Sequence, residues 1–157
     1  MIATIPVGSG SGNPIGIAVD TTSGKVFTAN YYSESISVID ENTLSVAATI
    51  PDGDYHPIAF GVDSAHGKVY VSNYAVGPSF TSSANGVIID EASNSITSSF
   101  LTLGNARPLV VDETKGLLYI GDGMPNSVAG VSVYQTGLIE PHLTGQKSSM
   151  RRYYEVN

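Results

Sequence analysis

Three potential metal ligands fall within five residues, about a third of the way along the chain. Asp52, Asp54 and His56 alternate in the run D-G-D-Y-H. Carboxylate oxygens and an imidazole nitrogen in one loop are donors that a divalent cation accepts. A calcium loop needs further acids at fixed spacing, however, and Gly53 suits an ordinary turn. We therefore expect no metal or other cofactor, and name these three residues as the candidates if a metal binds.

The rest of the sequence offers few side chains for nucleophilic or acid–base catalysis. His66 lies in an expected hairpin turn and His142 in the tail, and neither belongs to an acid–nucleophile constellation. The chain has no cysteine, so no catalytic residue is predicted. Tyrosine is the plentiful functional side chain, with nine copies and no tryptophan. A tyrosine ring combines a large apolar face with a polar tip, which makes it a good contact residue.

A sequence motif that occurs three times indicates which structural elements position these side chains. It reads GKVFTAN from Gly24, GKVYVSN from Gly67 and GLLYIGD from Gly116, each copy four residues after an aspartate. Repetition at roughly 40–50 residues indicates one supersecondary unit used several times. The second unit is longer because it carries extra residues between Asn73 and Gly86.

Each unit reads as short strands separated by turns. β-branched and aromatic runs alternate with Gly, Asp, Asn and Ser, and no window has a helical apolar period. The expected strands lie at 15–19, around 26–27, 36–39 and 46–50, then at 58–62, around 69–70, 87–89 and 96–103, and finally at 109–111, around 118–119 and 131–134. The aspartates that close strands are expected to form turns by accepting backbone amide bonds: Asp20, Asp40, Asp63, Asp90 and Asp112.

Four antiparallel strands per repeat predict an all-β fold made of β-propeller blades. The chain resembles the YVTN-type β-propeller repeat family, whose second-strand motif stands here as FTAN at 27–30, YVSN at 70–73 and YIGD at 119–122. The phrase ATIP, at 48–51 and again at 3–6, matches the end of that repeat. The resemblance implies three four-stranded blades at about 9–51, 52–104 and 105–140, an orphan outer strand at 2–7, and an irregular tail at 141–157.

Propeller loops that join strands four to one and two to three share the face that usually binds ligands. This arrangement gathers the candidate ligand-binding residues: Tyr31, Tyr32, Tyr55, His56, Tyr74, Phe80 and Arg107. Tyr31 and Tyr74 recur in the repeat, so we expect them to pack between blades. Tyr32, Tyr55 and Phe80 do not recur, which favours a contact role. Arg107 either meets an acidic ligand or pairs with Asp122.

The charge of the chain narrows the classes of partner. A net charge of −7 argues against nucleic acid, which needs a basic footprint. No run of about 20 apolar residues is present, so no membrane span is predicted. A body poor in charge and rich in Ser, Thr, Asn and Tyr resembles extracellular surface proteins of the repeat family. An extracellular or cell-surface location is therefore expected by analogy.

The number of blades poses a separate question. Closed propellers have about 4–8 blades, and three are visible. Ile2–Val7 is a fourth-strand phrase with no blade before it, and the third unit has no good fourth strand. The chain is either part of a larger propeller, a homo-oligomer that exchanges Ile2–Val7 between copies, or an open half-ring.

Three classes of function remain open at this point. The favoured one is a non-catalytic binding or scaffold module for a protein or glycan partner. A propeller enzyme of the lactonase or lyase type is the first alternative, and a self-assembling structural subunit is the second. The first strands, PIGIAV, PIAFGV and PLVV, carry no ionisable group before their closing aspartate. Catalysis in a central channel would need such groups.

Overall fold

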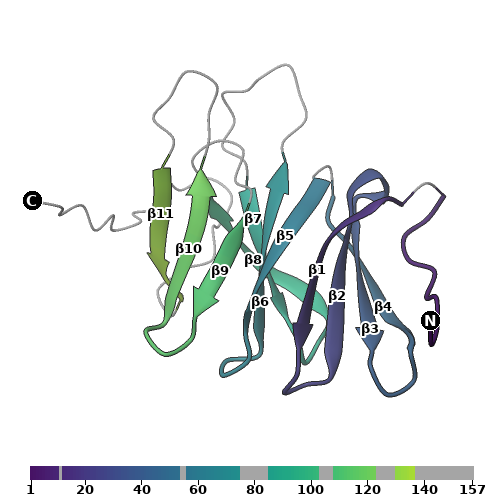
Figure 1. Ribbon diagram of the computed structural model, residues 1–157. Helices are drawn as coiled ribbons and strands as arrows, with labels where there is room; N and C mark the ends of the chain where they lie inside the picture. The colour runs from purple at the N-terminus through teal and green to yellow at the C-terminus, as the bar shows by residue number, and fades with distance from the viewer. Residues whose placement is uncertain (11, 54–55, 75–84, 103–107, 123–129, 137–157) are drawn as a thin grey trace, which may run out of the picture.

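The chain folds into a row of three antiparallel sheets, which we call blades one, two and three (Figure 1). The computed structural model describes residues 1–10, 12–53, 56–74, 85–102, 108–122 and 130–136. Within each sheet, every strand pairs with its neighbour in sequence. The predicted all-β architecture of propeller blades is confirmed.

The blades have the following strands. Blade one contains β1 (Pro14–Asp20), β2 (Lys25–Asn30), β3 (Ser35–Asp40) and β4 (Ser45–Pro51). Blade two contains β5 (His56–Asp63), β6 (Lys68–Tyr74), β7 (Asn85–Asp90) and β8 (Ser95–Leu101). Blade three contains β9 (Leu109–Asp112), β10 (Leu117–Asp122) and β11 (Gly130–Gln135), and no fourth strand among the described residues.

Apolar faces hold the row together. Since strand side chains alternate between two faces, blade two can contact one neighbour with each of its faces. One core joins blades one and two and includes Phe27, Ala29, Ile36, Val38, Ile50, Phe60, Val69, Val71, Val87 and Ile89. A second joins blades two and three and includes Tyr70, Ile88, Phe100, Leu109, Leu118 and Ile120. The row therefore depends on blade two burying both of its faces.

The innermost strands β1, β5 and β9 lie next to one another along the row (Figure 1). Their close approach requires small residues. A side chain on Gly16 would collide with the backbone carbonyl of Ile58, and one on Gly61 would collide with Leu109. Gly16 therefore allows the backbones of β1 and β5 to approach, and Gly61 leaves room for the Leu109 side chain.

A turn follows each of the five strand-closing aspartates, and at four of them the carboxylate accepts backbone amides, as predicted. Asp20 accepts from the Thr22 amide at 2.7 Å and Asp112 from the Thr114 amide at 3.1 Å. Asp40 and Asp90 accept in the same way from amides two or three residues later. The Asp63 carboxylate instead accepts from the His66 ring, at 2.8 Å.

Hydrogen bonds in these turns also change the acidity of the aspartates. The Thr43 and Asn42 amides both donate to the exposed Asp40 carboxylate, at 2.9 Å and 2.8 Å. Because they stabilise the charged form, they hold the pKa of Asp40 below its usual value. The turn aspartates thus act as acceptors for the backbone.

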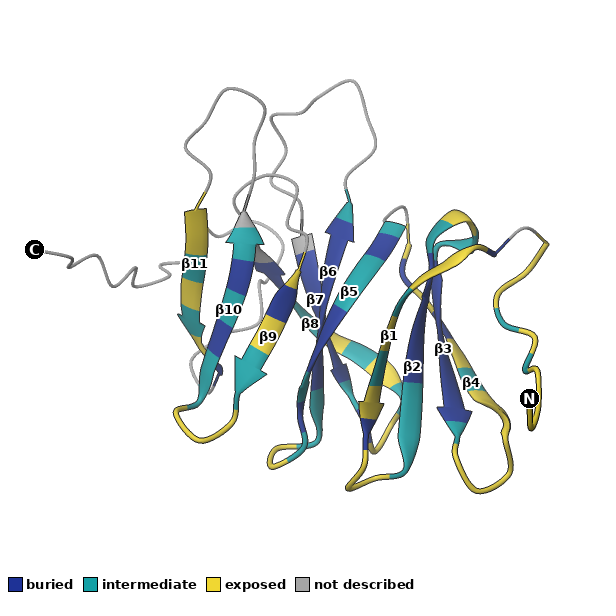
Figure 2. Cartoon of the chain, viewed as in Figure 1, coloured by how far each residue is buried: buried dark blue, intermediate teal, exposed yellow. Residues whose placement is uncertain are grey.

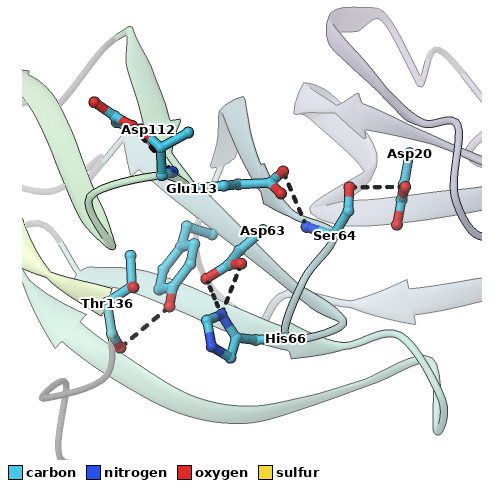
Figure 3. Close-up of polar contacts among 9 residues, drawn as sticks. Asp20, Asp63, Ser64, His66, Asp112, Glu113 and Thr136 are labelled. Atoms are coloured by element: carbon cyan, nitrogen blue, oxygen red, sulfur yellow. Dashed lines mark hydrogen bonds and ion pairs between the residues drawn. The ribbon is translucent and has the colours of Figure 1, made fainter.

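Polar contacts also join the turns of successive blades (Figure 3). The Ser64 hydroxyl donates to Asp20 Oδ1 at 2.8 Å, and the Ser64 amide donates to Glu113 Oε1 at 3.2 Å. One turn residue of blade two thus bonds both neighbouring blades. The buried Tyr70 hydroxyl donates to the Thr136 carbonyl at 3.3 Å, and burial raises the pKa of Tyr70 to about 12.

Leu44 provides a test of the repeat. It has φ 50° in the turn between β3 and β4, and the matching residue between β7 and β8 is Asn94, with φ 48°. Leucine is strained in this left-handed region, whereas asparagine tolerates it. Leu44→Asn should therefore raise the free energy of unfolding by roughly 0.5–1 kcal/mol in urea titrations. Leu44→Ala is the control, because alanine loses the side chain without gaining tolerance. Equal effects of the two substitutions would refute the backbone explanation.

Candidate functional site

The structure brings four of the predicted contact residues together. Tyr31, Tyr32, His56 and Tyr74, which we call the aromatic cluster, lie where the loops of blades one and two meet. The remaining predicted contact residues and one metal candidate lie outside the described residues: Tyr55, Phe80, Arg107 and Asp54.

A short 3-10 turn, which the sequence analysis did not predict, orients the first two tyrosines. It spans Tyr31–Ser33 directly after β2 and ends at Glu34, which has φ 47°. The Tyr31 amide donates to the Asn13 carbonyl at 3.2 Å, and the Tyr32 amide donates to the Gly12 carbonyl at 3.3 Å. The segment that enters blade one therefore fixes the turn.

The rings of the aromatic cluster contact one another across the junction between blades. Tyr31 stacks on His56, with centroids 4.5 Å apart and planes 16° apart. Tyr32 meets Tyr31 edge-on at 5.1 Å, and Tyr74 lies 6.3 Å from Tyr31. His56 Nδ1 donates to the Tyr31 carbonyl at 2.8 Å, which locks the imidazole in place. Tyr31 and Tyr74 are both half-buried, consistent with their expected packing between blades.

An open hollow of about 300 Å³ lies beside this stack, lined by Ile15, Tyr31, Ile58 and Tyr74. Its walls combine two aliphatic side chains with two tyrosines. The volume is at the lower end for small-molecule pockets. The hollow therefore suits one ring or one side chain of a larger partner.

Asp52 lies buried beside Asn73, with 3% of its surface exposed. Asn73 Nδ2 donates to Asp52 Oδ1 at 3.3 Å, while Asp52 Oδ2 and Asn73 Oδ1 have no hydrogen-bond partner among the described residues. Burial raises the pKa of Asp52 to about 7; the Asn73 bond lowers it and the nearby Glu34 carboxylate raises it further. Across the described residues, no three His, Asp or Glu side chains gather closely enough to hold a metal ion.

A comparison of blades explains why Asn73 keeps an unpaired oxygen. The matching residue of blade one, Asn30, donates to Ser37 Oγ at 2.9 Å and accepts from Thr28 Oγ1 at 3.2 Å. In blade two, valines replace Ser37 and Thr28. Asn73 and Glu34 were missed by the sequence analysis, although the asparagine that ends each of the first two motifs was a visible signal.

Known structures resemble this fold, while no family model and no curated protein matches the sequence. Hydrazine synthase from Kuenenia stuttgartiensis superposes with a TM-score of 0.68 at 18% identity, over 79% of this chain and 34% of that chain. A nidogen/laminin complex superposes with a TM-score of 0.63 at 18% identity, over 81% of this chain and 46% of that chain. The match thus spans less than half the length of either known chain. At this identity the likeness establishes the β-propeller fold.

One further expectation concerns membranes. Within the part of the chain that the structure describes, no helix is long and apolar enough to cross a membrane.

The buried carboxyl of Asp52 predicts a pH dependence of stability. Its pKa is about 7 in the folded protein and 3.8 as a reference value, so the folded state binds the proton more tightly. The contribution of this group should therefore be fully present below about pH 4 and fall between pH 4 and 7, by up to about 1.4 kcal/mol per pH unit. Asp52→Asn keeps the shape without the charge and should flatten this slope. Urea unfolding of both proteins from about pH 5 to 8 measures the difference, and parallel slopes would contradict the assignment.

Proposed function

We propose that the chain is a non-catalytic binding module whose aromatic cluster takes a protein or glycan partner. The observation that carries this proposal is the stacked Tyr31–His56 pair beside the hollow. Tyr32 extends the same surface and is 64% exposed. Rigid aromatic rings offer contact area at low cost in conformational entropy.

The chemistry of the cluster favours contact over catalysis. His56 donates one ring proton to the Tyr31 carbonyl, and the walls of the hollow are tyrosine and isoleucine. Apolar walls with a few polar groups are typical of recognition sites. A stacked ring can cover an apolar side chain or the flat face of a sugar equally well.

The proposal includes a family and a location. Membership of the YVTN-type repeat family is supported by the FTAN and YVSN motifs, which form β2 and β6. An extracellular or cell-surface location is supported by the low content of charge. The similar fold in a nidogen/laminin complex gives weak support to a protein partner.

We further infer that the chain works as part of a larger ring, through exchange of Ile2–Val7. Residues 1–7 repeat the ATIP phrase of β4 yet lie outside every described sheet. A strand sequence outside the sheets and a blade three with three strands among the described residues are complementary features.

Binding screens on a glycan array and a peptide library test the module. Tyr32→Ala should weaken binding of any captured ligand by roughly tenfold or more, because it removes an exposed contact ring. Tyr32→Phe keeps the ring and should retain most of the affinity.

Leu44→Ala is the matched control, since Leu44 is also exposed but lies in a hairpin turn at the other end of blade one (Figure 1). Equal losses in Tyr32→Ala and Leu44→Ala would count against the aromatic cluster as the binding site.

A further inference from the structure

The outer face of blade three exposes positions that are buried elsewhere in the row. Val133 pairs with Tyr119 as Val38 pairs with Phe27, and Val131 pairs with Gly121 as Ile36 pairs with Ala29. Ile36 and Val38 are fully buried against blade two, whereas Val131 is 66% exposed and Val133 is 46% exposed. The outer face of blade three thus has the pattern of a blade-to-blade interface without its blade (Figure 2).

The outer face of blade one, at the opposite end of the row, also exposes positions that are buried in blade two. Ile17 pairs with Thr28 as Phe60 pairs with Val71, so Ile17 and Phe60 are equivalent. Phe60 is buried in the core between blades one and two, while Ile17 is 73% exposed. Val19 is exposed too, although its counterpart Val62 packs against that core.

Neither end has the charges that usually protect an open sheet. β11 carries no charged residue, and β1 and β9 carry only their closing aspartates. Exposed apolar faces without charge are typical of interaction surfaces. The two faces lie at opposite ends of the row (Figure 1), so one chain cannot bring them together.

We propose that a second copy of this chain covers the outer face of blade three with its own blade one. The contact repeats the packing that already joins blades inside the chain. Two such contacts place six blades in one closed ring, within the usual range of about 4–8. This inference specifies the assembly proposed above and does not depend on the aromatic cluster.

Residues 1–7 carry a fourth-strand sequence that can pair with β11, the outermost described strand of blade three. Ile5 occupies the place of Ile50 in the ATIP phrase; Ile50 is buried in β4, while Ile5 is half-exposed. The Gly8 amide lies 3.5 Å from Ser37 Oγ, which ties the end of this segment to blade one. In the ring, residues 2–7 of one copy pair with β11 of the other.

Light scattering tests the proposal by measuring the mass of the full chain in solution. The unmodified protein should have the mass of two chains. Val131→Asp with Val133→Asp, and separately Ile17→Asp, should each give the mass of one chain. These positions are exposed within one copy, so circular dichroism should show that both variants fold. Ala65→Asp adds a charge at an exposed turn residue of blade two, which forms neither of the two faces, so this variant should remain a dimer.

Mixing the two monomeric variants gives the sharper result. A mixed pair contains one contact with both substitutions and one contact with none, so the mass of two chains should return in part. A face that binds itself would give no such recovery.

A monomer at the highest soluble concentration would overturn the proposal. A mass that keeps growing with concentration would also overturn it, since that indicates an open chain of copies. So would dissociation of Ala65→Asp to the same extent as the face variants. Ligand capture by the aromatic cluster is measured separately, so failure of one proposal leaves the other standing.

Discussion

Face-to-face packing of apolar sheets is the constraint on which this structure depends. A four-stranded blade exposes two faces, and each face that alternates with valine, isoleucine and phenylalanine must be covered. Blade two satisfies this requirement on both sides, through Phe60 and Val71 toward blade one and Tyr70 and Phe100 toward blade three. The same requirement explains why the ends of the row are the unsatisfied parts of the molecule.

Polar groups at the junctions act in a different way from the apolar faces. Ser64 bonds to Asp20 on one side and Glu113 on the other, which fixes the relative position of three turns. Asp52 lowers the stability of the fold, because its carboxyl is buried and one of its oxygens has no hydrogen bond among the described residues. The two ends of the junction between blades one and two are therefore unlike: the turn end is hydrogen-bonded, and the loop end combines stacked rings with a buried acid.

The repeated phrase was enough to predict the architecture, because turn aspartates and alternating strands are local signals. Asp40 and Asp112 form the turns that their spacing indicated. The 3-10 turn at Tyr31–Ser33 was missed, since three residues cannot produce a helical period. The contact between Asp52 and Asn73 was missed for another reason: it joins two segments far apart in sequence, and no local pattern encodes which side chains meet there. The stacking of Tyr31 on His56 likewise emerged only from the packing of blades.

The hydrogen-bonded set of Thr28, Asn30 and Ser37 has a consequence for modularity. These polar residues occupy positions where blade two has Val71 and Val87 or leaves an asparagine oxygen unpaired. The polar groups on this face of blade one therefore bond to one another, whereas the matching face of blade two packs its valines against blade one. The blades share a fold but are not interchangeable, because matching positions on their faces carry polar side chains in blade one and apolar ones in blade two.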